Sequence, residues 1–184
     1  MSIGLHIKDK SENSRFLKAA SFRKNTRKTE PHKHNSYFEI IYLSEGRGFH
    51  AIDNRKYEVT PPVLFFIRHE QVHYWALDDD LEPDGYVLIL KRSFFEKSLD
   101  GELKHLLAKI SKLSCAYLED DITIRQLFEL IVRENAKEAE INFSFTEGLL
   151  KGLFVKILQM GRSVIERSTH QAELYRAFIE LLIQ

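Results

Sequence analysis

The chain has 184 residues, of which 43% are hydrophobic and 29% charged, a composition typical of globular proteins that argues against disorder. Lysine and arginine together number 27, as do aspartate and glutamate, so the net charge is zero. A surface that binds nucleic acid is normally basic, so we do not expect these residues to bind DNA or RNA directly.

The single cysteine, Cys115, cannot form an internal disulfide, which fits a cytoplasmic protein. No apolar run is long enough to span a membrane, and the N-terminus has no signal-peptide pattern. We therefore expect a cytoplasmic location and no membrane partner.

The first part of the chain predicts β-structure. An arm over residues 1–14 and an irregular edge strand over residues 15–25 come first. Asp53-Asn54 suits a two-residue hairpin turn, because both residue types tolerate positive φ. Short strands separated by turn residues predict a closed β-barrel or jelly roll. The strands are expected over residues 37–44, 47–52, 56–60, 63–67, 72–77 and 86–90.

The pattern becomes helical at Ser93, where Ser93 to Glu96 matches a capping box. Apolar residues then recur at helical spacing to Leu113, with a break at Gly101. The later helices are expected over residues 122–137, from a second capping box at Ser144 to Arg167, and over residues 171–184.

The last expected helix reaches the end of the chain without a C-cap, which indicates one piece of a longer protein. The fold class is therefore α+β. We expect a β-barrel domain with its arm over residues 1–92 and a helical region over residues 93–184.

Four polar side chains form the most specific pattern in the β-rich half. His32 and His34 are two residues apart, so on a strand they would face the same side. Glu39 lies five residues after His34, so the chain must turn near Asn35-Ser36 if all three converge. His73 comes from another strand and must be brought in by the fold.

These residue types leave two interpretations open. Three imidazoles and one carboxylate (His32, His34, His73 and Glu39) suit Zn²⁺, Fe²⁺, Mn²⁺ or Ni²⁺. The same histidines can instead hydrogen-bond one another, or a bound organic molecule, without any metal or other cofactor.

The spacing His32-x-His34-x4-Glu39-x6-Gly46 resembles the first cupin motif, and the segment from Ile67 to His73 resembles the second. The wider pattern, together with the helical region that follows, resembles the effector-binding half of AraC-type bacterial transcription regulators.

This resemblance implies a small polar effector, such as a sugar, held in the barrel. The residues that fit this role are His32, His34, Glu39, His73 and Trp75. Trp75 would offer its indole face for stacking, although a core aromatic is an equally good interpretation. Tyr42 and His50 are weaker candidates, and the strand parity of Tyr42 is opposite to that of Glu39, which places it in the wall.

The resemblance also implies a homodimer, and one helix carries an approximate coiled-coil seam. The seam residues are Leu150, Leu153, Phe154, Ile157 and Val164. DNA would be bound by helix-turn-helix units that this sequence does not contain. Before the buried strand the chain has Pro62-Val63, and before His73 it has Arg68 and Glu70, all of which depart from the usual pattern.

The alternative function is a metal-dependent cupin enzyme of the dioxygenase or isomerase type, using the four residues named above. A simple cupin enzyme has no need of a long helical region, so we expect no enzyme here. A third interpretation is a dimerisation module with an empty barrel.

Overall fold

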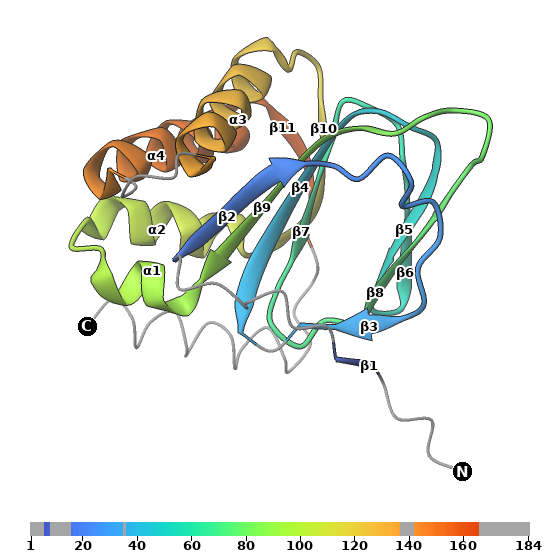
Figure 1. Cartoon of the computed structure of the whole chain (residues 1–184), viewed down its shortest axis with the longest axis horizontal. Helices are drawn as coiled ribbons and strands as arrows, with labels where there is room; N and C mark the ends of the chain where they lie inside the picture. Colours follow the sequence, from blue (N-terminus) through green and yellow to red (C-terminus); the bar gives the residue numbers. More distant parts are fainter. Residues whose placement is uncertain (1–5, 8–15, 35, 137–141, 166–184) are drawn as a thin grey trace.

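Two β-sheets pack face to face, and helices cover the outer face of the larger sheet (Figure 1). The computed structural model describes residues 6–7, 16–34, 36–136 and 142–165. This arrangement confirms the predicted α+β class, in which a cupin-like β-structure is followed by helices.

The smaller sheet has five strands in the order β1-β3-β8-β5-β6. Asp53, at the turn between the last two strands, has a positive φ of 51°, as expected of the predicted hairpin turn. All the pairs are antiparallel except the parallel pair of β1 and β3. The strands are β1 (His6–Ile7), β3 (His32–Lys33), β8 (His73–Leu77), β5 (Gly48–Ile52) and β6 (Arg55–Glu58).

The larger sheet has six strands in the order β11-β10-β7-β4-β9-β2, all antiparallel. Its central strands are rich in apolar and aromatic residues, which suit a strand that is covered on both faces. The strands are β11 (Gly161–Ile165), β10 (Leu113–Leu118), β7 (Val63–Ile67), β4 (Tyr37–Glu45), β9 (Asp84–Lys91) and β2 (Leu17–Ser21).

Strand β4 separates two cores because its side chains alternate between the two faces of the sheet. Phe38, Ile40 and Tyr42 face the helices and belong to what we call the helix-side core. Ile41 and Leu43 face the smaller sheet and belong to the barrel-side core, together with Phe65 and Trp75 among others.

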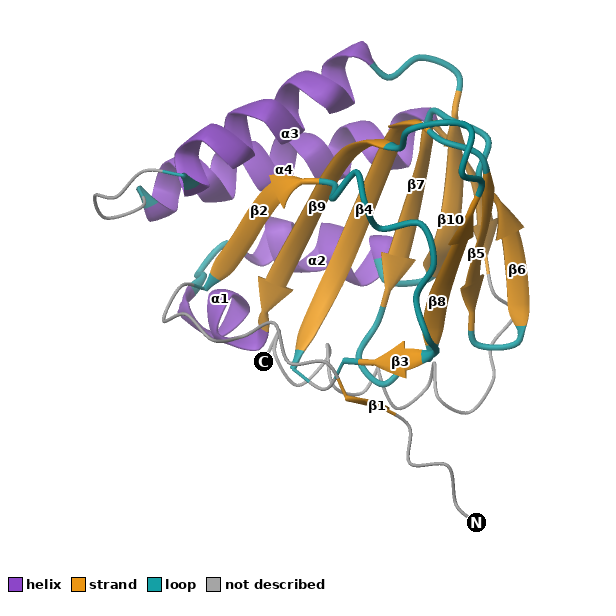
Figure 2. Ribbon diagram, turned by 45° about the vertical axis from the view of Figure 1, so that its right-hand side comes forward, coloured by secondary structure: helices purple, strands orange, loops and turns teal. Residues whose placement is uncertain are grey.

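Four helices lie on the helix side of the larger sheet, as Figure 2 shows. Each buries an apolar stripe against the sheet or a neighbouring helix; in α2 this stripe contains Leu103, Leu106, Leu107 and Ile110. The helices are α1 (Arg92–Lys97), α2 (Gly101–Ile110), α3 (Ile122–Asn135) and α4 (Phe143–Met160). Among the described residues, none of the helices is long and apolar enough to cross a membrane.

The expectation that the chain after Ser93 forms only helices is wrong at β10 and β11. Strand β10 lies between β7 and β11 in the larger sheet, so the second half of the chain extends the same sheet. The run from Leu113 to Leu118 is almost entirely buried, and such a short apolar run fits either a strand or a helix by pattern alone.

The predicted capping box at Ser93 is also wrong. Helix α1 already begins at Arg92, and its N-cap residue Lys91 makes no side-chain capping bond. The Glu96 carboxylate instead pairs with the Arg92 side chain at 2.7 Å, one helical turn away. It is therefore not available to cap the backbone as a capping box requires.

Helix α4 differs from the prediction at both ends. Asn142 caps it, because its side-chain oxygen accepts the backbone N–H of Phe145 at 3.0 Å, so Ser144 lies inside the helix. The helix ends at Met160, and β11 follows directly. The predicted helix over residues 171–184 lies outside the described residues.

The predicted dimer seam does not form a surface in this structure. Leu150, Leu153, Phe154 and Ile157 are at most 1% exposed and pack in the helix-side core. Val164 lies on strand β11, not on the helix. The seam spacing therefore reflects burial against the chain's own sheet and helices, because the same periodicity serves both purposes.

Candidate functional site

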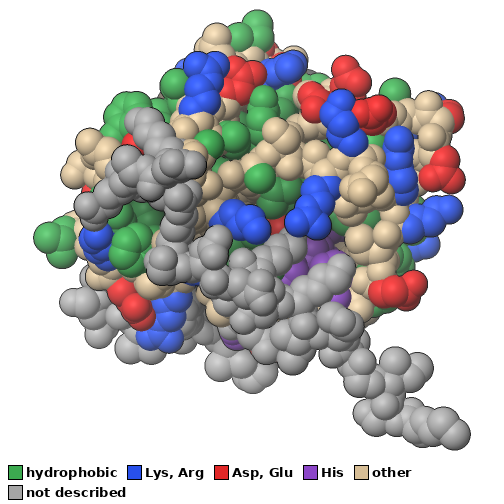
Figure 3. Space-filling model, in the orientation of Figure 1, with side chains coloured by type: hydrophobic (Ala, Val, Ile, Leu, Met, Phe, Trp, Pro, Cys, Tyr) green, Lys and Arg blue, Asp and Glu red, His purple; other side chains and the backbone are tan. Residues whose placement is uncertain are grey.

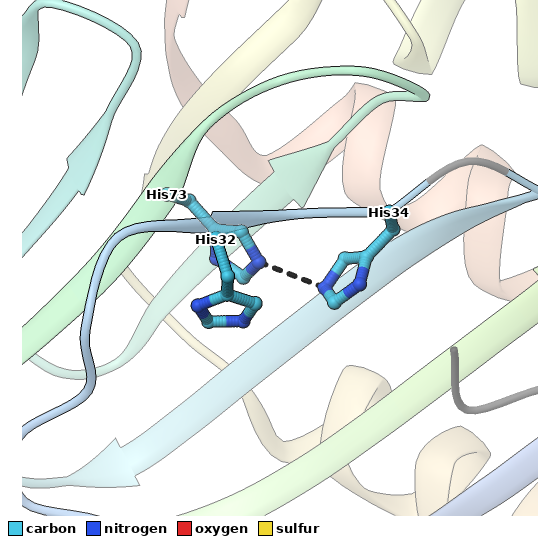
Figure 4. Close-up of side chains that lie close together, drawn as sticks. All are labelled: His32, His34 and His73. Atoms are coloured by element: carbon cyan, nitrogen blue, oxygen red, sulfur yellow. Dashed lines mark hydrogen bonds between the residues drawn. The ribbon is translucent and has the colours of Figure 1, made fainter. Parts of the chain in front are cut away.

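The predicted polar residues converge between the two sheets. His32 on β3 is directly opposite His73 on β8 in the smaller sheet, and Glu39 lies on β4 in the larger sheet. Strand β3 ends at Lys33 and β4 begins at Tyr37, so the strand is interrupted between His34 and Glu39, as the residue spacing required. Figure 4 shows that the imidazole rings of His32, His34 and His73 lie close together.

His34 lies at the centre of this group. Its Nε2 is 2.8 Å from Nε2 of His73 and 3.2 Å from Oε2 of Glu39. The same carboxylate oxygen is 4.0 Å from Nε2 of His73. Because all three side chains are at most 2% exposed, these contacts form with little competition from water.

The other ring nitrogens are held by second partners. Nδ1 of His32 is 2.8 Å from the Glu30 carbonyl oxygen. Nδ1 of His34 is 2.6 Å from the Tyr37 hydroxyl, and Nδ1 of His73 is 3.0 Å from Nε2 of His50. A carbonyl oxygen only accepts hydrogen bonds, so His32 in its neutral form carries its proton on Nδ1 and its lone pair on Nε2.

His50 is the fourth histidine of the site, on β5. We call His32, His34, Glu39, His50 and His73 the histidine cluster. Burial lowers the pKa of His50 to about 3 and lowers the pKa of His73 well below its ordinary value. Both rings are therefore neutral at neutral pH, and each offers one N–H donor and one lone pair.

The cluster has donors that suit a divalent metal ion. One ring nitrogen from each of His32, His34 and His73 lies within 4.8 Å of the other two. With bonds of about 2.0–2.1 Å, the ligands of a tetrahedral zinc ion are roughly 3.3 Å apart, so small shifts would let one ion contact all three. Glu39 could supply an oxygen ligand from β4. The residues thus fit the ion that the cupin-like spacing implies.

A comparison with known families agrees with this architecture. The model of the AraC-like ligand binding domain matches residues 18–154, which include most of both sheets, without β1 and β11, and most of the helical layer. The chain belongs to this family. It is therefore an AraC-like ligand-binding domain of the kind found in AraC-family regulators.

Solved structures of the same fold are distant in sequence. ToxT from Vibrio cholerae, in an apo form, aligns with 92% of this chain over 66% of its own length, at 15% identity and a TM-score of 0.55. This chain thus spans about two thirds of ToxT. The AraC-like transcriptional activator CuxR aligns with 90% of the chain over 56% of its own length, at 12% identity and a TM-score of 0.43.

A cupin protein from Bacteroides fragilis aligns with 46% of this chain over 68% of its own length, at 22% identity and a TM-score of 0.34. No curated protein sequence matches the chain significantly. At 15% identity and a TM-score of 0.55, ToxT supports the fold alone and leaves the ligand of this family member open.

Trp75 does not present a free stacking surface. Its ring lies 3.7 Å from the His50 ring, with 10° between the planes, and Phe22 and Phe65 meet it edge-on. The side chain is only 4% exposed. This geometry favours the interpretation of Trp75 as a core aromatic that supports the cluster from behind.

Tyr42 lies on the helix side, as its strand parity predicts. It is stacked with Phe128 of α3, with ring centroids 5.5 Å apart, and its hydroxyl bonds to the Asp121 carboxylate. Burial and this carboxylate raise its pKa. Tyr42 therefore belongs to the wall of the sheet and not to the cluster.

His50 and Tyr37 make direct contacts with the other histidines of the cluster that the sequence did not indicate. His50 is in register with Trp75 and so lies diagonally across from His73, a relation that depends on how β5 pairs with β8. Tyr37 reaches His34 because the chain turns between β3 and β4. The only signal in the sequence is the inward strand parity of His50.

The loop between β7 and β8 connects the cluster to the helices. The backbone N–H of Glu70 donates to the His34 carbonyl at 2.9 Å, and the Lys33 ammonium pairs with the Glu70 carboxylate. Arg68, only 8% exposed, donates to the carbonyl of Ser111 at the end of α2, at 3.1 Å. The residues that depart from the usual family turn thus make the link between the two layers.

Charged side chains elsewhere on the described surface are mixed in sign. On the face shown in Figure 3, lysine and arginine alternate with aspartate and glutamate without a large area of one sign. A groove of about 510 Å³ is lined by Lys28, Arg47 and the acidic run Asp78–Asp80. Arg47 pairs with Asp78 at 2.6 Å and with Asp80 at 2.5 Å, so the charges in this groove largely satisfy one another.

Proposed function

We propose that this domain senses a small ligand at the histidine cluster and serves as the effector-binding part of an AraC-family transcription regulator. One observation carries the proposal: four imidazoles and a carboxylate, each at most 3% exposed, converge between the two sheets beside the apolar barrel-side core. Burying so many polar groups is costly, and such sites are commonly retained for function.

The effector we propose is a small polar molecule or ion that bonds directly to imidazole and carboxylate groups. A sugar-like molecule, as the family resemblance implies, would place hydroxyl groups against His32, His34, Glu39 and His73. The support for stacking on Trp75 is weak, because His50 already covers one face of the indole. Hydrogen bonds or coordination at the histidines would therefore provide most of the specificity.

We further propose that the domain acts as part of a homodimer and affects DNA only through a separate DNA-binding domain. A zero net charge and the mixed charges on the face shown in Figure 3 support an indirect role in DNA binding. Binding would shift the population of two conformations, and the helical layer would pass this shift on.

The second candidate is binding of a divalent metal ion at the cluster, either as the sensed species or as the centre of a cupin-type enzyme. Three ring nitrogens within 4.8 Å of one another favour this candidate. His32, His34 and His73 would hold the ion, with Glu39 as a fourth ligand. A bound ion would act as a Lewis acid at this site.

Elemental analysis and thermal unfolding test both candidates. A ligand that binds only the folded protein raises the free energy of unfolding, by about 2.7 kcal/mol at one hundred times its Kd. The melting temperature rises with it. We expect a rise with a divalent ion or with a polar small molecule, and no rise in a His34→Leu variant. His105→Leu, at an exposed position on α2, is the matched control.

The outcomes separate the candidates. Stoichiometric metal in protein purified without added ions would support the metal site. A rise in melting temperature with small polar molecules, but not with divalent ions, would rule out the metal site. If neither class raises the melting temperature of the wild-type domain, the sensing proposal is wrong and the barrel is a purely structural unit.

A further inference from the structure

His34 differs from the other members of the histidine cluster because it lies outside the strands. Strand β3 ends at Lys33 and β4 begins at Tyr37, so His34 belongs to the connection between them. Its backbone carbonyl accepts the N–H of Glu70 at 2.9 Å, but it takes no part in the strand pairing of the described residues. The orientation of its ring must therefore come from contacts of the side chain itself.

Tyr37 contacts the His34 ring in two ways. Its hydroxyl oxygen is 2.6 Å from Nδ1 of His34, and its ring stacks on the imidazole with centroids 4.6 Å apart and 28° between the planes. A hydroxyl both donates and accepts hydrogen bonds, so this bond forms with either tautomer of His34. The contact therefore sets the orientation of the imidazole and does not depend on which nitrogen carries the proton.

The Tyr37 side chain is itself held in place by the larger sheet. Tyr37 is the first residue of β4, and its backbone pairs with that of Lys91 on β9. The residue is only 4% exposed. Protein interiors are close-packed and keep side chains in defined rotamers, so the Tyr37 hydroxyl stays at a fixed position beside His34.

Two residues of β4 lie on either side of the His34 ring. Tyr37 and Glu39 are two residues apart on the strand, so their side chains point to the same face of the sheet. While Nδ1 of His34 faces the Tyr37 hydroxyl, its Nε2 is 3.2 Å from Oε2 of Glu39. The same Nε2 is 2.8 Å from Nε2 of His73. A half-turn of the ring would put carbon atoms in both places, so the bond to Tyr37 keeps Nε2 directed at the cluster.

We propose that Tyr37 is a positioning residue that holds the His34 ring with Nε2 directed into the histidine cluster. The inference rests on the proposed function, since the direction of Nε2 matters to a ligand only if the cluster binds one. One ring nitrogen from each of His32, His34 and His73 lies within 4.8 Å of the other two. A divalent cation would then meet a third imidazole that is already oriented, and less binding free energy would be lost in ordering this side chain.

A purely structural role for Tyr37 gives a different expectation. Removal of its hydroxyl would then change stability and leave ligand affinity unaltered. Tyr42 provides a matched comparison, because it is buried on the same strand with its ring in the helix-side core and its hydroxyl bonded to the Asp121 carboxylate. Tyr37→Phe and Tyr42→Phe each remove one hydroxyl and keep the ring, so they differ mainly in the face of the sheet that is changed.

Calorimetric titration with Ni²⁺ alone tests the positioning role. Loss of a group that orients a metal-binding histidine typically lowers affinity by about 10–100-fold, which we expect for Tyr37→Phe. Tyr42→Phe should bind Ni²⁺ with the wild-type affinity. Urea denaturation of both variants establishes that each is folded under the conditions of the titration. An unchanged affinity in Tyr37→Phe, or an equal loss in Tyr42→Phe, would overturn the proposal.

Metal-free crystal structures of the two variants give a readout that needs no ligand. In Tyr37→Phe the buried Nδ1 of His34 loses its hydroxyl partner, and a buried polar atom without a partner is costly. We therefore expect the ring to turn, or to occupy two orientations, with its Nε2 farther from Nε2 of His73 than the 2.8 Å of the wild type. In Tyr42→Phe the ring should keep its orientation. A single, unchanged orientation of His34 in Tyr37→Phe would contradict the positioning role.

The two readouts separate this inference from the proposed function. Absence of Ni²⁺ binding in the wild type would reject the metal candidate, and the metal-free structures would still decide whether Tyr37 orients His34. Wild-type binding of Ni²⁺ with an unchanged affinity in Tyr37→Phe would support the metal site and reject the positioning role. A wild-type crystal structure with Nδ1 of His34 turned away from the Tyr37 hydroxyl would overturn the proposal even if Tyr37→Phe failed to fold.

Discussion

The two faces of the larger sheet support two different cores. On the helix side, β4 contributes Phe38, Ile40 and Tyr42 to a mainly apolar core, near which Glu134 and Asn135 of α3 are also buried. On the barrel side, the same strand contributes Ile41 beside the buried carboxylate of Glu39. Apolar burial stabilises a fold roughly in proportion to area, whereas buried polar networks stabilise it little and depend on every partner being present. We therefore expect the helix-side core to contribute most of the stability, and the barrel side contains the proposed ligand site.

The largest expected effect tests the stabilising role of the helix-side core. Phe154 on α4 is fully buried, so Phe154→Ala should lower the free energy of unfolding by about 3–5 kcal/mol. Urea denaturation monitored by circular dichroism measures this change. A loss below about 1 kcal/mol would show that the helices contribute little to the fold.

The second prediction concerns one member of the barrel-side network. His34→Leu removes the partner of His73, Glu39 and Tyr37 at once, and should cost about 1–3 kcal/mol by leaving buried polar groups unsatisfied. Adding Glu39→Leu should recover part of this loss, because the carboxylate is then no longer buried without that donor. A double-mutant cycle with additive losses would contradict the network.

The third prediction concerns pH. The pKa of folded His50 is lowered to about 3 mainly by burial, with Glu39 opposing the shift and His32 adding to it, and the pKa of His73 is lowered too. Between about pH 6.5 and 3 the unfolded chain binds a proton at His50 that the folded protein does not, and His73 acts in the same direction. This contribution to stability is therefore fully present above pH 6.5 and is lost as the pH falls. One such group contributes a slope of about 1.4 kcal/mol per pH unit.

Urea denaturation at pH 7.5 and pH 5.5 measures this slope. A His50→Phe variant should show a shallower loss on acidification, because one of the groups has been removed. Equal slopes in the wild type and His50→Phe would mean that residues other than His50 cause the loss of stability in acid.

The smallest expected loss of stability comes from a surface mutation, with which the losses from the two cores can be compared. Arg92 and Glu96 form an exposed ion pair one turn apart on α1, so Arg92→Ala should cost only about 0.3–0.5 kcal/mol. The loss should shrink in high salt, because salt screens exposed charges. A cost comparable to that of His34→Leu would undermine the contrast between surface and network.

Much of the barrel could be predicted from the sequence because strand alternation and turn residues are local signals. The strand over Tyr37–Glu45 and the turn at Asp53 are as expected. The strand at Leu113–Leu118 was missed, because its short apolar run directly follows a helix and fits either a strand or a helix by pattern alone. Propensity alone could not show that β7 leaves an edge for it to pair with.

The site was predicted only in part. The convergence of His32, His34 and Glu39 follows from their spacing once a turn is allowed, and His73 was placed by its resemblance to the second cupin motif. The role of His50 depends on the register between β5 and β8, which is a long-range property. For the same reason the sequence could not show that the stacking face of Trp75 is covered.

The loop between β7 and β8 has a mechanical consequence. It is bonded to the His34 backbone through Glu70 and to the end of α2 through Arg68. Its Gln71 side chain also donates to Asp53 at 2.7 Å, which ties it to the β5–β6 turn. A ligand that displaces the backbone of His34 must therefore either break its hydrogen bond to the Glu70 N–H or move the β7–β8 loop together with His34. The hydrogen bond from the Arg68 guanidinium to the Ser111 carbonyl would transmit a movement of the loop to the C-terminal end of α2.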